Sequence, residues 1–178
     1  GSTYYYKVAA VNDNGTGSLS SESSAVLSAN IMGSETNSGH TYALTSSTMN
    51  WDEAALAAAA VGGYLAILNT KDENVWLYEK FGNYGGSSRD LWIGSKDNIT
   101  EGGWYWYTGT TSGDGGVTDN ISSGATWPDG THKWRQASSE PNNAGSGEDC
   151  GTIRASLNTY TWNDIPCTNN YYGIIEID

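Results

Sequence analysis

The sequence has little positive charge, a single Phe and no long apolar run. Its 178 residues contain 8 Lys and Arg against 20 Asp and Glu, giving a formal net charge of −12. A surface of this sign repels nucleic acid and anionic lipid, so it favours cations or neutral ligands as partners. No stretch approaches the roughly 20 apolar residues that a membrane span needs, so we expect no membrane insertion. The chain is instead rich in Gly (23), Tyr (12) and Trp (8), which is typical of a loop-rich fold with amphipathic aromatic residues.

Cysteine is also scarce. Cys150 and Cys167 are the only two, and they form no CxxC pair, zinc spacing or haem motif. A single disulfide between them is the simplest interpretation. It would stabilise the fold by about 3 kcal/mol and indicates an oxidising compartment. Because no signal peptide or anchor is visible, we expect the chain to be a piece of a longer exported protein.

The first 29 residues differ in character from the rest. Residues 3–11 are rich in aromatic and β-branched side chains, and Asn12-Asp13-Asn14-Gly15 follows as a strong turn signal, so we predict a β-hairpin. The segment resembles the last two strands of a fibronectin type III module. We therefore expect residues 1–30 to be a module remnant or linker before a main domain at 31–178; the alternative is that the hairpin is an integral part of that domain.

Two capping boxes predict two short helices in the main domain. Asn50 with Glu53 opens an Ala-rich helix that Gly62-Gly63 ends, and Thr70 with Glu73 opens a second helix that closes near Phe81. We expect these helices to precede the other elements of the domain, apart from a short buried strand between them. Strands are predicted at 64–68, 91–94, 104–106, 150–154, 160–162 and 173–177. Helices followed by strands indicate an α+β fold.

Side chains with oxygen ligands gather in the last third of the sequence. Glu140-Pro141-Asn142 precedes Glu148, and Asn163-Asp164 follows later; Asn143 and Asp149 lie nearby. Ca²⁺ takes six to eight oxygen ligands from carboxylates and amides, so this set predicts a calcium site. Zinc prefers His or Cys, which these segments lack.

Taken in order, these motifs resemble a C-type lectin domain, close to the mannose-binding proteins. The resemblance runs from about residue 39 to the end of the sequence. It rests on the following segments: His40-Thr41-Tyr42, Trp51-Asp52-Glu53-Ala54, Gly62-Gly63-Tyr64-Leu65, Leu91-Trp92-Ile93-Gly94, Glu140-Pro141-Asn142 and Trp162-Asn163-Asp164. It implies the C-type lectin-like fold, with two short helices, small antiparallel sheets and long calcium-binding loops.

The resemblance also implies the site residues. Those that match the family's primary calcium ligands, and contact the bound sugar, are Glu140, Asn142, Glu148, Asn163 and Asp164. Those that match a second calcium site are Asp97, Glu101, Asn143 and Asp149, with Glu148 shared. Close relatives place Asp where this chain has Asn143, so we expect the second site to be weaker. The family's long disulfide is absent; Ala58 and Ile175 stand at its positions, and we expect an apolar contact between them.

The implied function is calcium-dependent carbohydrate binding rather than catalysis. The Glu-Pro-Asn triplet goes with vicinal hydroxyls of mannose, glucose, N-acetylglucosamine or fucose, on cell surfaces or polysaccharide. The fibronectin-like segment suggests an extracellular or cell-surface adhesin, and the Ser-, Gly- and Asn-rich style suggests a bacterial parent. A glycoside hydrolase is the enzymatic rival, disfavoured because the carboxylates are better explained as shared metal ligands. The remaining alternative is protein or ice binding through the loop at 108–126.

The aromatic residues and histidines complete the predictions. Trp92, Trp104, Trp106 and Trp162 are expected in the core. Three residues nearer the loops are candidates for stacking on sugar: Tyr107, Trp127 and Trp134. The two histidines, His40 and His132, have no visible partner in the sequence and are given no role.

Overall fold

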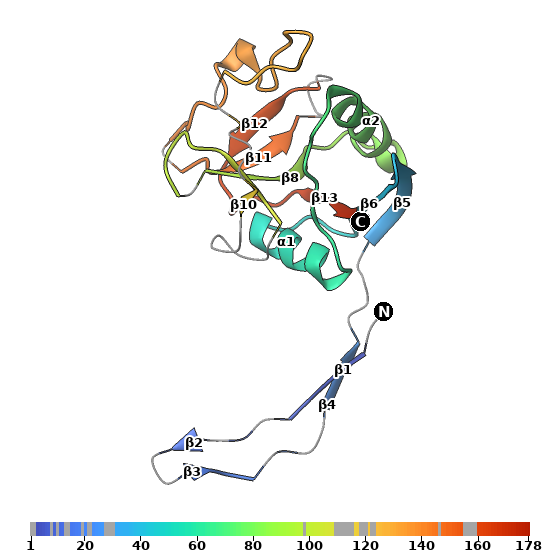
Figure 1. The fold of residues 1–178 in the computed structure, drawn as a ribbon, viewed down its shortest axis with the longest axis vertical. Helices are drawn as coiled ribbons and strands as arrows, with labels where there is room; N and C mark the ends of the chain where they lie inside the picture. Colours follow the sequence, from blue (N-terminus) through green and yellow to red (C-terminus); the bar gives the residue numbers. More distant parts are fainter. Residues whose placement is uncertain are drawn as a thin grey trace.

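The structure is a computed structural model in which two helices pack against a mixed β-sheet (Figure 1). It describes residues 3–7, 9, 11–12, 15–18, 20, 23–26, 31–97, 99–108, 116–117, 121, 124–145, 147–154 and 160–178. Most of the loop predicted at 108–126 therefore lies outside the described residues. Among the residues that are described, no helix has the length and apolar content that crossing a membrane requires.

Within the described part of the chain, nine strands form one connected network. The path β10-β9-β8-β13-β6-β5 is extended by β11, which pairs with β8 and β12, and by β7, which pairs with β13. The bounds are β5 Ile31–Asn37, β6 His40–Thr45, β7 Tyr64–Leu65, β8 Leu91–Lys96, β9 Tyr105–Tyr107, β10 Gly116–Val117, β11 Cys150–Ile153, β12 Trp162–Ile165 and β13 Tyr172–Ile177. The α+β class is confirmed. Small antiparallel sheets were predicted, and most strand pairs are antiparallel; the exception is β13, which lies between β6 and β8 and runs parallel to β8.

Both predicted helices are confirmed with their capping boxes. Helix α1 (Trp51–Ala60) begins after Asn50, whose side chain accepts from the Glu53 backbone amide at 2.9 Å while Glu53 accepts from the Asn50 amide. Helix α2 (Lys71–Phe81) begins after Thr70 with the same reciprocal pair to Glu73. Each box satisfies amide groups that have no partner inside the first helical turn.

Three predictions about the order and the bounds of the elements need correction. The helices do not come first, because the hairpin β5–β6 precedes α1. Strand β5 ends the path of the sheet, and most of its residues are exposed, so it carries no apolar alternation. The strand predicted at 160–162 is β12, Trp162–Ile165, which places Asn163 and Asp164 inside the strand. The strand predicted at 64–68 is only β7, although Ala66, Ile67 and Leu68 are buried.

Tryptophan forms the centre of the core. The Trp162 ring lies edge-on to those of Trp106, Trp127 and Trp134, with ring centres 5.5, 5.6 and 5.7 Å away. Such pairs contribute about 0.5–1.5 kcal/mol each beyond their burial. The prediction that Tyr107, Trp127 and Trp134 stack on sugar is therefore wrong, because at most 4% of each residue is exposed. Trp162, which directly precedes Asn163 and Asp164, is thus held in place by three neighbouring rings.

Helix α1 is joined to the sheet by an apolar contact. Ala58 and Ile175 are both fully buried and belong to one cluster with Ala43. This agrees with the apolar contact expected between Ala58 and Ile175.

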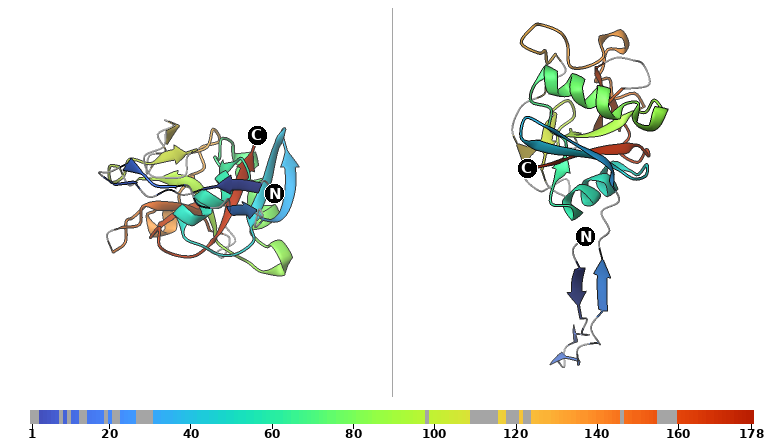
Figure 2. Two further views of the ribbon diagram at one scale, coloured as in Figure 1. Left: turned by 90° about the horizontal axis from the view of Figure 1, so that it is seen from below. Right: turned by 90° about the vertical axis from the view of Figure 1, so that its right-hand side faces the viewer.

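The predicted N-terminal hairpin is present. Strand β1 (Thr3–Tyr6) pairs antiparallel with β4 (Ser23–Val26), and β2 (Val11–Asn12) with β3 (Gly15–Thr16). Among the described residues these four strands pair only with one another. The hairpin extends away from the sheet, and the segment at 124–145 lies at the opposite end of the domain (Figures 1 and 2).

Candidate functional site

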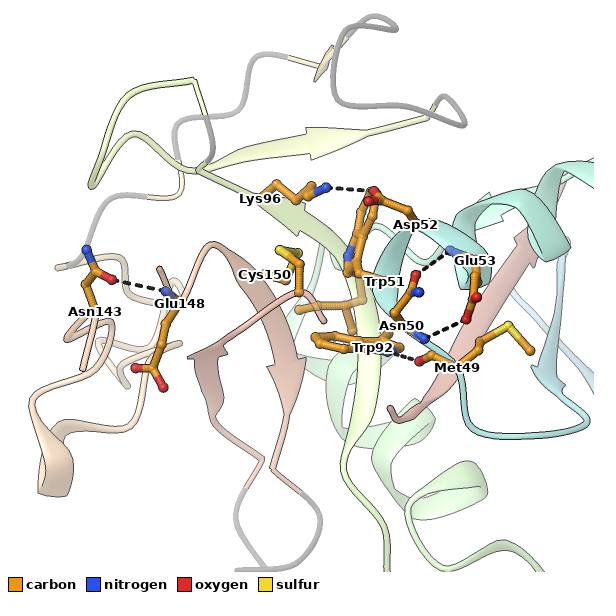
Figure 3. Close-up of a disulfide and its surroundings, with 12 residues drawn as sticks. Met49, Asn50, Trp51, Asp52, Glu53, Trp92, Lys96, Asn143, Glu148 and Cys150 are labelled. Atoms are coloured by element: carbon orange, nitrogen blue, oxygen red, sulfur yellow. Dashed lines mark hydrogen bonds and ion pairs between the residues drawn. A yellow bond between two sulfur atoms is a disulfide. The ribbon is translucent and has the colours of Figure 1, made fainter. Parts of the chain in front are cut away.

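The site is built on the antiparallel pair β11–β12. Gly151 lies opposite Asp164 and Thr152 opposite Asn163, so both residues of the Trp-Asn-Asp motif are fixed by backbone pairing. The Cys150–Cys167 disulfide is present and joins the start of β11 to the turn after β12. In Figure 3, Cys150 lies between the buried Trp51 and Trp92 and the loop that carries Asn143 and Glu148.

A second pair of strands brings the earlier carboxylates to the same place. Strands β8 and β11 are antiparallel with Lys96 opposite Cys150, and the Asp97 amide donates to the Asp149 carbonyl at 3.1 Å. Asp97 is buried, and its Oδ2 accepts from the Gly102 amide at 2.9 Å. Residues about 50 positions apart therefore meet where β8 ends and β11 begins.

The Glu-Pro-Asn triplet follows a short 3₁₀ turn at Gln136–Ser138. The Glu140–Pro141 peptide bond is cis, and the Asn142 side-chain amide donates to Glu140 Oε2, so the two flanking side chains lie side by side. Glu140 is buried whereas Asn142 is exposed. The triplet therefore presents one shielded carboxylate and one accessible amide.

Asn143 connects the two groups of predicted ligands. Its backbone amide donates to Asp164 Oδ2 at 2.7 Å, and its side-chain amide donates to Glu101. Its Oδ1 accepts from the Gly147 and Glu148 amides at 2.6 and 3.0 Å, the latter drawn in Figure 3. Asn143 thereby holds the loop between Glu140 and Glu148 closed.

The carboxylates repel one another and are partly desolvated. Burial, a hydrogen bond with Asp164 and the charges of Asp164 and Glu148 raise the pKa of Glu140 to about 7. Burial, together with the charges of Glu101, Asp149 and Asp164, raises the pKa of Asp97 to about 6, although the Gly102 amide lowers it. The pKa of Glu148 is raised as well, chiefly by burial. Such a cluster is stabilised by any bound cation.

The chemistry of these groups fits a hard divalent cation. Asn163 Oδ1, Asp164 Oδ1 and Asp97 Oδ1 are buried and have no hydrogen-bond partner in the described structure. Buried polar atoms without partners are costly, and carboxylate and amide oxygens are the ligand types that Ca²⁺ takes. Hydrogen bonds join Asn143 to Asp164, to Glu101 and to the Glu148 amide, and join Asn142 to Glu140. Among the described residues, however, no three of the predicted carboxylates each bring an oxygen within 4.8 Å of the others. Their assignment as metal ligands stays a prediction.

One group of polar residues was missed. His40 was given no role, yet its Nδ1 lies 2.5 Å from Asp178 Oδ1 and 3.3 Å from Glu176 Oε1. The sequence offered one weak signal, the Glu-x-Asp spacing at 176–178, because alternate residues of an extended segment lie on the same face.

Two helices against a mixed sheet, with polar loops at one end, is the architecture of C-type lectin-like domains. The chain belongs to this family: the family model described as "Lectin C-type domain" matches residues 47–175. It is 32% identical over 138 residues to human "C-type lectin domain family 4 member E", covering 76% of this chain and 53% of that protein. It is 31% identical over 126 residues to the "Perlucin-like protein" of Mytilus galloprovincialis, covering 71% of this chain and 68% of that protein. The chain thus spans about half the length of the first of these relatives.

Solved structures share the fold. The Kupffer cell C-type lectin receptor Clec4f matches with a TM-score of 0.60 and 23% identity, over 82% of each chain. Murine dendritic cell inhibitory receptor 2, solved in complex with N-glycan, matches with a TM-score of 0.59 and 18% identity, over 82% of this chain and 95% of that one. A calcium-independent type II antifreeze protein matches with a TM-score of 0.58 and 19% identity, over 82% of this chain and 94% of that one. The fold alone therefore does not decide whether calcium is used.

Proposed function

We propose that this domain binds carbohydrate through Ca²⁺ held by Glu140, Asn142, Glu148, Asn163 and Asp164. The observation that carries the proposal is the pair of buried, unpartnered oxygens on Asn163 and Asp164, beside a Glu140 whose pKa is raised. Members of the family are generally calcium-dependent carbohydrate-binding proteins, which agrees with this chemistry.

Bound Ca²⁺ would supply a centre to which two vicinal sugar hydroxyls add as ligands. The protein side chains do the rest: carboxylates accept hydrogen bonds from these hydroxyls, and the Asn142 and Asn163 amides donate to hydroxyl oxygens. The two N–H groups of the Asn142 amide donate to Glu140 and to the Ser138 carbonyl, so a sugar hydroxyl would take the place of one of these two acceptors. The exposed Asn142 and half-buried Glu148 would lie at the rim, and the buried Asn163 and Asp164 at the base.

The ligand class follows from the triplet. Glu-Pro-Asn favours mannose, glucose, N-acetylglucosamine or fucose, on cell surfaces or polysaccharide, over galactose. We expect no catalysis, in keeping with the binding role of the family.

A second, weaker Ca²⁺ is proposed at Asp97, Glu101, Asn143 and Asp149, with Glu148 shared. Asp97 Oδ1 is its unpartnered buried oxygen. Since Asn143 bridges this group to Asp164, occupancy of the second site would stiffen the first.

The parent protein is proposed to be extracellular or on the cell surface, as the disulfide favours. An adhesin with a fibronectin type III-like remnant at 1–30 agrees with the hairpin, which extends away from the loops and would act as a spacer (Figure 1). The relatives named above are animal proteins, so the bacterial parent suggested by composition has no support from them.

The alternative is protein or ice binding through the loop at 108–126, and one fold neighbour is an antifreeze protein. A glycan array on the calcium-loaded chain, run with Asn163→Ala, separates the two. We expect wild type to label mannose- or fucose-type glycans and Asn163→Ala to label none. Binding to a protein partner or to ice that Asn163→Ala leaves unchanged, with an unlabelled array, would favour the alternative.

A further inference from the structure

A second polar cluster lies where strand β13 ends beside β6. It consists of His40 at the start of β6 and Glu176 and Asp178 at the end of the chain, and one ligand atom from each lies within 4.8 Å of the others. In Figure 1 the end of the chain lies beside β6 and away from the segment at 124–145. The cluster shares no residue with the proposed calcium ligands.

Each carboxylate has one oxygen held by the protein and the other directed at His40. Glu176 Oε2 accepts from the Ile67 amide at 3.0 Å, and Asp178 Oδ2 accepts from the Tyr64 hydroxyl at 2.8 Å. Their other oxygens, Oε1 and Oδ1, lie 3.3 and 2.5 Å from His40 Nδ1. Ligands of protein metal sites are oriented by such outer hydrogen bonds.

The charges around the cluster are negative. Tyr42 connects a further carboxylate, Glu73, to Glu176: the Tyr42 hydroxyl is 2.6 Å from Glu73 Oε1 and 3.5 Å from Glu176 Oε1. Glu176 is only 2% exposed, so its charge is poorly solvated. His40 and Asp178 are 44% and 58% exposed, and a cavity of about 170 Å³ lined by His40, Tyr42 and Glu73 opens beside them. Glu176 itself does not line this cavity, so an ion would reach it from the exposed side of His40 and Asp178.

We propose that His40, Glu176 and Asp178 bind a zinc-class divalent cation. Imidazole nitrogen and carboxylate oxygen are both ligand types that Zn²⁺ takes, and water would complete a tetrahedron, whereas Ca²⁺ requires six to eight oxygens. The 3.3 Å between His40 Nδ1 and Glu176 Oε1 is close to the edge of a tetrahedron with metal–ligand distances near 2.0–2.1 Å. The shorter distance to Asp178 is a hydrogen bond that the ion would replace, with release of the His40 proton.

Such an ion would fasten the last strand to the first strands of the domain. His40 and Asp178 are 138 positions apart, so the ion would link two segments that lie close together only in the folded chain. An ion that binds only the folded form also stabilises it by mass action.

The test is isothermal titration with ZnCl₂ on tag-free chain saturated with calcium, at pH 7.5. His40→Gln and Asp178→Asn are compared with His132→Gln, the chain's other histidine, as the matched control. We expect one zinc site in wild type and in His132→Gln. His40→Gln and Asp178→Asn should weaken it at least about tenfold, because each removes a direct ligand. Zinc should raise the melting temperature of wild type but not that of His40→Gln.

Three results would overturn the proposal: no zinc binding by folded wild type, equal weakening by His132→Gln, or displacement of zinc by millimolar calcium. Circular dichroism of His40→Gln shows whether it is folded; if it is not, the result for Asp178→Asn decides. If His40 and Asp178 form only an ion pair, His40→Gln lowers stability in metal-free buffer while wild type binds no zinc. The outcome is independent of sugar binding, because Glu140→Gln should keep the zinc site.

Discussion

Replacing Glu140 by Gln should stabilise the calcium-free domain, although the residue is buried. The carboxylate is held near Asp164 and Glu148, and burial and these charges raise its pKa from an ordinary 4.5 to about 7. A shift of this size corresponds to about 3 kcal/mol against the ionised form. Gln has the same shape without the charge, and its carbonyl oxygen still accepts from the Asn142 amide.

The sign of the pH dependence follows from the raised pKa. Between about pH 4.5 and 7 the folded state holds a proton on Glu140 that the unfolded state has lost, so stability falls as pH rises through this window. At pH 8 the variant should therefore exceed wild type by about 3 kcal/mol, or roughly 6–12 °C in melting temperature. At pH 5 the gap should shrink to less than about 1 kcal/mol, because wild type is then mostly protonated.

Urea and thermal unfolding in EDTA at both pH values measure this difference. Glu35→Gln, on the exposed edge strand, is the matched control and should shift stability by no more than about 0.5 kcal/mol. Added calcium should raise the melting temperature of wild type by more than that of Glu140→Gln, which keeps only the second proposed calcium site. A variant that is equally or less stable than wild type at pH 8 in EDTA would refute the argument that the carboxylates are crowded.

Three further predictions concern residues that support the candidate site or the second proposed calcium site. Replacing both Cys150 and Cys167 by Ser should cost about 3 kcal/mol in urea unfolding and weaken calcium binding; unchanged calcium affinity would show that the disulfide does not shape the loop. Asn74→Ala should cost about 2 kcal/mol, because it leaves the Trp162 indole N–H without its 2.8 Å acceptor; a cost within error would contradict this. Asp97→Asn should reduce the calcium stoichiometry from two to one while mannose binding persists, and loss of both ions would argue against two separate sites.

Local patterns in the sequence predicted the helices well. The capping boxes at Asn50 and Thr70 set both helix starts because they act within four residues. The edge strand β5 was not predictable in the same way, since an exposed strand carries no apolar alternation and forms only because β6 pairs with it. The burial of Trp127 and Trp134 was missed for a related reason: their partner Trp162 lies far along the chain.

Of the candidate site residues, too, the sequence predicted some and missed others. The proposed calcium ligands were found because their types and order resemble a family pattern, and the pairing of β8, β11 and β12 then explains how residues from 97 to 164 meet. His40 had no such pattern. Its partners lie 136 and 138 positions away and approach it only because β6 pairs with β13.

Calorimetric titration of mannose into the calcium-loaded chain, repeated in EDTA, tests the central claim most directly. The account predicts saturable binding with calcium, weaker binding of galactose, and no heat of binding once EDTA has removed the metal. Mannose binding that survives EDTA unchanged, or no sugar binding by the calcium-loaded protein, would contradict it.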